Sequence, residues 1–124
     1  RVDLYYEHQD KFIDQLKRCT TIHKNVAHIN YRDQDVIYAG NRFMVYALFP
    51  QINISVHEIW GKNKRNVVFA AGKSIFNRTS KMNIGEFMLQ FHGGGHIAAG
   101  TCQVPAKDAE QVREAIITAM RQDV

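Results

Sequence analysis

Hydrophobic residues recur along this chain at the two spacings that distinguish helices from strands. Four segments show helical spacing and predict amphipathic helices: residues 8–21, 41–49, 83–91 and 107–122. In the first of them, Phe12, Leu16 and Cys19 share one apolar face, so this helix is expected to pack on a core. Pro50 closes the second segment, because proline cannot continue a helix.

Alternating or β-branched apolar runs predict strands between these helices. The runs are residues 25–31, 54–60, 66–76 and 100–105. The second and third runs flank the polar connection Gly61–Arg65 and are typical of a β-hairpin. The order of elements predicts an α+β (mixed α/β) fold, with a mixed sheet of four or five strands and helices packed on it.

Length and composition favour one globular domain over residues 1–124, since 45% of the residues are hydrophobic. The formal net charge of +4 favours anionic partners such as phosphate esters or nucleic acid. No apolar run approaches the roughly 20 residues that span a bilayer, and no signal-peptide pattern is present. We therefore expect a cytoplasmic protein without a membrane partner.

Cysteine and lysine motifs suggest little catalytic chemistry. Cys19 and Cys102 lie in different contexts and are expected to be free thiols. Cys102 lacks an adjacent base, so a small buried strand residue explains it better than a nucleophile. The run AAGKS at 70–74 ends like a phosphate-binding P-loop, but Val67 replaces the first glycine of that motif.

The run FHGGGHIAAG, residues 91–100, places three consecutive glycines between a predicted helix and a predicted strand. Because glycine loses much conformational entropy on folding, such a run is expected to have a role that only its backbone geometry can fill. One such role is a sharp turn after the helix. The other is a nest of free backbone amides that bind an anion, with His96 beside it. His92 and His96 could also suggest a metal pair, but glycines between them exclude a helical face.

The segment HGGGHIAAG resembles the GGGH-x-x-AG signature of the C-terminal substrate-binding domain of DHH-family phosphoesterases. This group includes RecJ-type exonucleases, oligoribonuclease/pAp phosphatases, exopolyphosphatase-related proteins and cyclic-dinucleotide phosphodiesterases. The resemblance covers residues 25–124, and the expected hairpin, short helix, glycine run, strand and last helix agree with it. It implies that the chain is the C-terminal part of a longer hydrolase.

The resemblance also implies which residues contact a phosphate-ester or short nucleic-acid substrate. The expected substrate-binding residues are Gly93, Gly94, Gly95, His96, Arg78, Lys73, Lys81 and His92. His92 stands where members often carry a fourth glycine. Many members of the family aim an arginine on a strand at a substrate phosphate. By the two-residue alternation of a strand, Phe76 occupies that position here and Arg78 lies on the same face. Lys73, Arg78 and Lys81 are therefore the candidates for the basic contact with the phosphate.

The family's manganese centre, built around an Asp-His-His triplet, belongs to a separate catalytic domain. No such triplet occurs in this sequence, so we expect no catalytic and no metal-binding residues here. The expected partners are the DHH catalytic domain of the same polypeptide and, as one possibility, a second copy in a homodimer.

Two other functions remain open. One is a noncatalytic nucleic-acid-binding module related to the C-terminal domain of alanyl-tRNA synthetases, which uses the same loop together with the basic segments 61–65 and 77–81. The other is purely structural and makes the glycines a tight turn.

Overall fold

The structure is a computed structural model that describes residues 2–38, 40 and 43–123, and only the backbone of residues 2–8. Its α-helices and strands are α1 (Val2–Cys19), β1 (Thr20–His23), β2 (Val26–Asn30), α2 (Met44–Leu48), β3 (Ile54–Trp60), β4 (Asn66–Lys73), α3 (Ile84–Met88), β5 (Gly94–Gly95), β6 (Ala99–Pro105) and α4 (Ala109–Arg121). Short 3-10 turns at Lys62–Lys64, Leu89–Phe91 and Ala106–Asp108 connect some of them.

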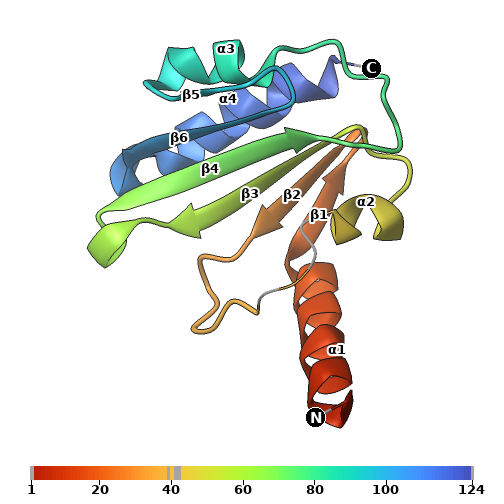
Figure 1. The fold of residues 1–124 in the computed structure, drawn as a ribbon. Helices are drawn as coiled ribbons and strands as arrows, with labels where there is room; N and C mark the ends of the chain where they lie inside the picture. The colour runs from red at the N-terminus through yellow and green to blue at the C-terminus, as the bar shows by residue number, and fades with distance from the viewer. Residues whose placement is uncertain (1, 39, 41–42, 124) are drawn as a thin grey trace.

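The six strands form one mixed sheet in the order β1-β2-β3-β4-β6-β5. Only β2 and β3 pair in parallel among the described strands, and the connection between them contains α2. The remaining neighbours are antiparallel, including the β3–β4 hairpin that the sequence predicts. Figure 1 shows β5 at the edge of the sheet beside α3.

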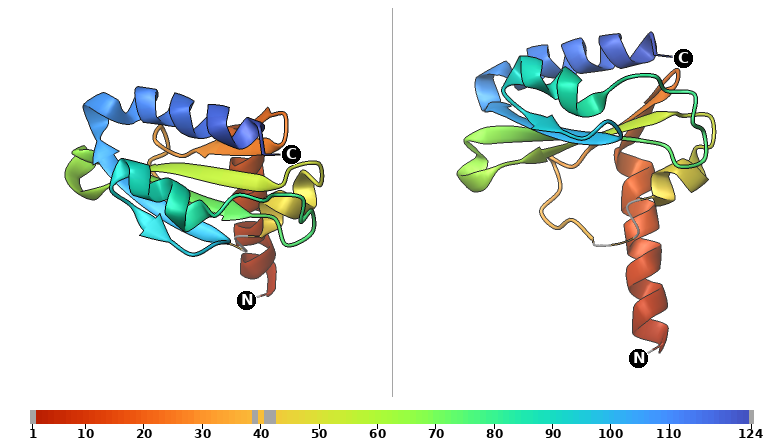
Figure 2. Two further views of the ribbon diagram at one scale, coloured as in Figure 1. Left: turned by 90° about the horizontal axis from the view of Figure 1, so that it is seen from above. Right: turned by 45° about the horizontal axis from the view of Figure 1, so that its top comes forward.

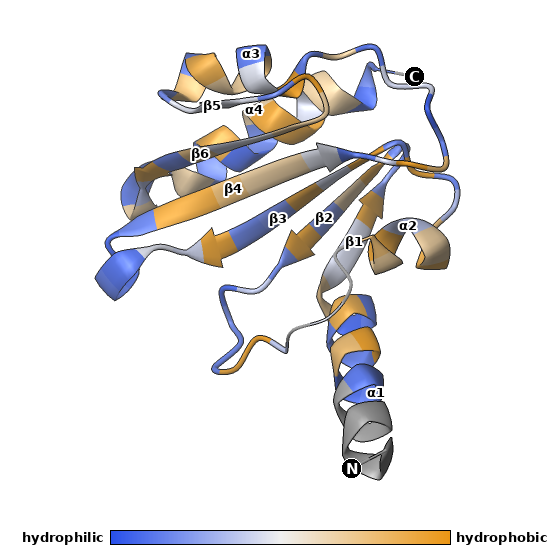
Figure 3. Ribbon diagram, in the orientation of Figure 1, coloured by the Kyte–Doolittle hydropathy of each residue, from blue (hydrophilic) through white to orange (hydrophobic). Residues whose placement is uncertain are grey.

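Helices cover both faces of this sheet. Helices α3 and α4 lie on one side, while α1 projects away from the other (Figures 1 and 2). Each face therefore has its own buried cluster. Phe69, Met88 and Ile116 belong to the cluster under α3 and α4. Phe12 and Leu16 belong to the cluster with α1, whose hydrophobic and hydrophilic residues alternate in bands in Figure 3.

The α+β class is confirmed, but the sheet has six strands rather than four or five. The first two residues of strand β1, Thr20 and Thr21, were expected to be the end of the first helix, and the other two were assigned to no element. The strand forms because Thr20–His23 pairs with β2 after a turn in which Lys24 has a left-handed φ of 63°. Strand β5 was not expected, because its two glycines carry no side-chain pattern. Both strands depend on pairing with the next strand along the chain rather than on local periodicity.

Several boundaries also differ from the expectation, and helix α1 begins at Val2 rather than at residue 8. The predicted second helix begins only at Met44, and Asn41 and Arg42 lie outside the described residues. Strand β4 ends at Lys73, so the prediction that residues 74–76 continue the strand is wrong. Phe76 and Arg78 therefore do not share a strand face, since the chain turns after Lys73. Among the described residues, no helix is long and apolar enough to cross a membrane.

Candidate functional site

The glycine run folds into a small hairpin at the edge of the sheet. Gly94 pairs with Thr101, and Gly95 pairs with Gly100. The His96 amide donates to the Ala99 carbonyl at 2.6 Å, and the Gly93 amide donates to the Met88 carbonyl at 2.9 Å. The amides of Gly93 and His96 are thus already used, and the alternation of the ladder makes Gly94–Thr101 a hydrogen-bonded pair as well, so a nest of consecutive free amides does not form.

The amide of Gly95 is oriented differently from its neighbours. Hydrogen-bonded and non-hydrogen-bonded pairs alternate along an antiparallel ladder. Since His96 donates to Ala99, the adjacent Gly95–Gly100 pair is the non-hydrogen-bonded type, and the Gly95 N–H points away from β6. The role of this hairpin in binding a substrate stays a prediction.

Close packing explains two of the three glycines. A Cβ atom on Gly93 would lie 2.1 Å from the Thr101 carbonyl oxygen, and one on Gly95 would lie 2.4 Å from that of Ala99. Gly95 also has a φ of +150°, which side chains rarely adopt. Gly94 differs, because a Cβ there would meet no atom within 4 Å. The turn therefore requires Gly93 and Gly95, whereas Gly94 borders open space.

Two of the predicted cations line a cavity beside the tip of this hairpin. The cavity has a volume of about 330 Å³ and is lined by Lys73, Ser74, Ile75, Arg78, Ser80 and Ala98. The Lys73 amide donates to the Ala98 carbonyl at 2.9 Å, which fastens the hairpin tip to the end of β4. Two cations from one segment and Ala98 from the hairpin tip thus line one cavity, whereas Gly93, Gly94, Gly95 and His96 do not line it.

The turn that carries Arg78 is held by hydrogen bonds within the protein. The Ser74 amide donates to the Asn53 carbonyl at 2.8 Å. The Ser74 hydroxyl oxygen accepts from the amides of Phe76 and Asn77, both at 3.0 Å. Arg78 donates through Nε to the Ile75 carbonyl at 3.2 Å. Hydrogen bonds within the chain therefore order this wall of the cavity without any contact to a ligand.

Asp123, after α4, fixes the other end of this segment. Its carboxylate accepts from the Lys81 amide at 2.8 Å, from the Met82 amide at 3.2 Å and from the Ser80 hydroxyl. Burial alone would raise the pKa of Asp123, but these hydrogen bonds and the charge of Lys73 lower it below its ordinary value. The carboxylate therefore stays ionised and connects the site to the last helix.

The remaining predicted residues lie in different places. His96 is exposed on the hairpin, two residues before Ala98. Lys81 is exposed and does not line the cavity. His92 has a left-handed φ of 63° and lines a second hollow of about 400 Å³ between β6 and α4, together with Gln103. The structure thus brings Lys73 and Arg78 together with the hairpin tip and separates His92 from them.

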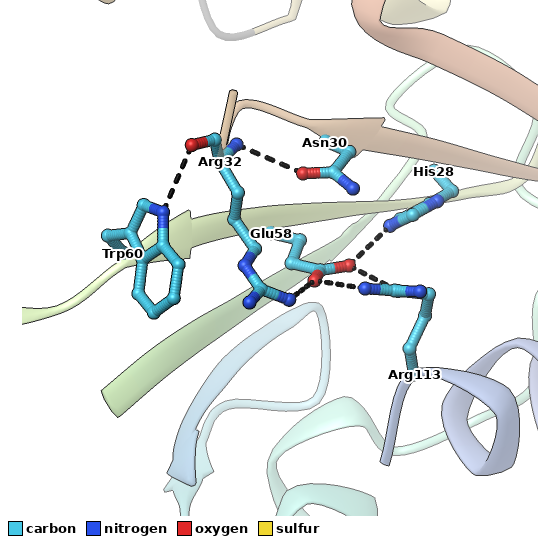
Figure 4. A network of polar contacts seen from close by, with 6 residues as sticks. All are labelled: His28, Asn30, Arg32, Glu58, Trp60 and Arg113. Carbon is cyan, nitrogen blue, oxygen red and sulfur yellow. Dashed lines mark hydrogen bonds and ion pairs between the residues drawn. The ribbon is translucent and has the colours of Figure 1, made fainter. Parts of the chain in front are cut away.

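A buried ion network holds α4 against the sheet, and nothing in the sequence pattern predicts it. Glu58 on β3 is fully buried. Its carboxylate accepts from His28 at 2.8 Å, from Arg32 at 2.9 Å and from Arg113 at 2.6 and 2.7 Å (Figure 4). The guanidinium of Arg32 also lies 4.3 Å from the Trp60 ring centroid.

The network keeps Glu58 ionised. Burial alone would raise the pKa of Glu58, but hydrogen bonds from His28, Arg113 and Arg32 lower it to about 2. Three of its four side chains come from β2, β3 and α4, which are far apart in the sequence. Because Arg113 lies on α4, the network positions the helix that leads to Asp123 and thereby supports the cavity at a distance.

Other candidate chemistry is not assembled in the described residues. Cys19 and Cys102 are free, as predicted. Cys102 is 2% exposed, and burial raises the pKa of its thiol to about 11, so it is a poor nucleophile at neutral pH. No three His, Cys, Asp or Glu side chains gather as metal ligands in the part of the chain that the structure describes.

Comparison with known proteins finds solved structures that this chain resembles. One is a pGpG-specific phosphodiesterase, PggH from Vibrio cholerae, which is 50% identical with a TM-score of 0.95 over 99% of this chain. Another is an exopolyphosphatase-related protein from Bacteroides fragilis, 14% identical with a TM-score of 0.62 over 94% of this chain, a likeness of fold alone.

The chain spans 42% of the Vibrio cholerae protein and 36% of the Bacteroides fragilis protein. It has no match among protein-family models or among curated protein sequences. The half-identical phosphodiesterase nevertheless covers almost the whole chain, including the glycine hairpin and the cavity beside it. The chain therefore resembles the C-terminal substrate-binding domain of DHH-family phosphoesterases, as its glycine motif predicts.

Proposed function

We propose that this chain is the substrate-binding domain of a manganese-dependent DHH-family phosphoesterase that acts on nucleotides or short oligonucleotides. The observation that carries the proposal is that Lys73 and Arg78 line one cavity together with Ala98, at the tip of the glycine hairpin. The likeness to a pGpG-specific phosphodiesterase supports a dinucleotide as one substrate. The chain contributes orientation and positive charge rather than bond cleavage.

The described residues do not fit a manganese ion, because no set of three ligands gathers among them. The proposal therefore assigns the metal centre to the catalytic domain of the complete enzyme. In this chain, Lys73 and Arg78 bind a substrate phosphate, and the hairpin limits where that phosphate can lie. Holding a substrate in a preformed cavity reduces the entropic cost of reaching a reactive arrangement.

The first experiment is a calorimetric titration of the 124-residue chain with guanosine 5′-monophosphate. Lys73→Ala and Arg78→Ala are each expected to weaken binding about tenfold, because each removes one charge-assisted hydrogen bond to phosphate. Lys64→Ala is the matched control, since Lys64 is an exposed cation in the turn at the other end of β4. An equal loss in all three variants would contradict a specific phosphate site.

The same variants distinguish the alternative, a noncatalytic nucleic-acid-binding module. In that case Lys64→Ala weakens binding of a longer single-stranded RNA, and the affinity falls steeply with salt, since each phosphate contact adds about 0.7 to the logarithmic slope. Nucleotide-sized binding with a shallow salt dependence, lost in Lys73→Ala, supports the phosphoesterase domain instead.

A further inference from the structure

Three exposed apolar residues belong to the lining of the cation-lined cavity or directly adjoin a lining residue in the sequence. Ile75 is 42% exposed and lines the cavity itself. Phe76 follows it directly and is 64% exposed. Ile97, also 64% exposed, precedes Ala98, which lines the cavity from the hairpin side. Single exposed apolar residues are ordinary, but a group beside a charged hollow indicates a binding surface.

The turn that carries Phe76 holds this side chain outward. The amide of Phe76 and the amide of the next residue, Asn77, share one acceptor, the hydroxyl oxygen of Ser74. The Asn77 side chain donates to the Gln51 carbonyl at 3.3 Å. Ser74 is itself only 5% exposed and bonded to Asn53 through its amide. The backbone under Phe76 is thus ordered without a ligand, which lowers the entropic cost of binding on it.

We propose that Phe76 is a platform for the base of a nucleotide whose phosphate binds Lys73 and Arg78. This inference rests on the proposed function and narrows its substrate class. An exposed aromatic ring stacks on the face of any nucleobase, so it adds affinity without selecting one base. Inorganic polyphosphate and base-free sugar phosphates gain nothing from the ring. Phe76 therefore selects nucleotides over other phosphate esters.

The test compares two ligands that differ only by the base, guanosine 5′-monophosphate and ribose 5-phosphate, by NMR titration of the 124-residue chain. Phe76→Ala is expected to weaken binding of the nucleotide about five- to tenfold and to leave ribose 5-phosphate unchanged. Phe76→Trp is expected to preserve the preference. In the unaltered chain, the guanine H8 resonance moves upfield on binding, and this shift is lost in Phe76→Ala.

Leu89→Ala is the matched control, because Leu89 is 63% exposed and does not line the cavity. It should change neither affinity. If Phe76→Ala weakens the binding of both ligands equally, or of neither, then the base platform is overturned. The proposal of a phosphate site at Lys73 and Arg78 is not overturned by that result. Failure of both ligands to bind at millimolar concentration overturns the proposed function as well. If Phe76→Ala abolishes a monomer–dimer equilibrium and leaves the nucleotide affinity unchanged, then the base platform is overturned, and Phe76 contacts a second copy of the chain instead.

Discussion

At the residue scale, the three glycines of the hairpin have different structural roles. Gly93 and Gly95 lie where a Cβ atom would overlap a carbonyl of the neighbouring strand, and the φ of Gly95 disfavours any side chain. Gly94 lies between them in a position without that restriction. A run that looks uniform in the sequence thus combines two residues required by packing with one that packing leaves free.

This difference predicts opposite outcomes for two alanine substitutions. Gly95→Ala should lower the free energy of unfolding by roughly 1–3 kcal/mol, because it adds both a close contact and backbone strain. Gly94→Ala should leave that free energy unchanged or raise it by about 0.5 kcal/mol, since a methyl group fits and the unfolded chain becomes less flexible. Urea denaturation followed by circular dichroism measures both.

The Gly94→Ala variant also tests the purely structural role of the glycines. If the substituted chain folds normally and binds nucleotide as tightly as the unaltered chain, then no ligand approaches the backbone closely at Gly94, as a purely structural role of this glycine requires. Weaker binding with unchanged stability indicates that a ligand approaches the backbone at Gly94.

At the scale of elements, Glu58 connects helix α4 to the sheet through three cationic or potentially cationic partners. Removing the charge of a buried carboxylate leaves its cations uncompensated, which typically costs more than the ion pair contributes. The exposed pair of Arg18 and Asp14 on α1 is a contrasting case, because water screens it.

Glu58→Gln should therefore lower the free energy of unfolding by about 3 kcal/mol at neutral pH. The pKa of Glu58 is about 2 in the folded state and 4.5 without the fold, so its stabilisation is present above pH 4.5 and is lost as the pH falls toward 2. The difference between the variant and the unaltered chain should shrink over that range in urea denaturation. Asp14→Asn, as the control, should change stability by less than about 1 kcal/mol. A difference that stays constant down to pH 3 would contradict the assigned pKa.

Asp123 makes a second prediction at this scale, because one carboxylate holds the segment that follows Arg78. An asparagine at this position has only one acceptor oxygen. Asp123→Asn should therefore release at least one of the amides of Lys81 and Met82, which donate to different oxygens of the carboxylate. The released amide is expected to exchange hydrogen at least about tenfold faster. Hydrogen exchange measured by NMR checks this, with the amides of β3 as the internal reference. Faster exchange throughout the sheet would indicate general destabilisation instead.

At the scale of the whole molecule, local patterns predict the helices and the central hairpin, because apolar spacing records which face each element buries. Strands β1 and β5 escape such reasoning, since pairing partners determine them and two glycines have no pattern. The sequence alone suggests Lys73 and Arg78 as candidate phosphate-binding cations. Only the three-dimensional structure shows that His92 lies at a different cavity. The Glu58 network cannot be predicted, because its members come from distant parts of the chain.

The length of strand β4 fixes the distance between two basic parts of the surface, one at each end of the strand. Its eight residues place the Lys62–Lys64 turn and Lys73 about 26 Å apart, at roughly 3.3 Å per residue. A mononucleotide or dinucleotide at Lys73 is too short to touch the basic turn at the other end. Affinity that climbs abruptly once an oligonucleotide exceeds this span would reveal that both ends of the strand take part, whereas affinity independent of length would confine recognition to one end.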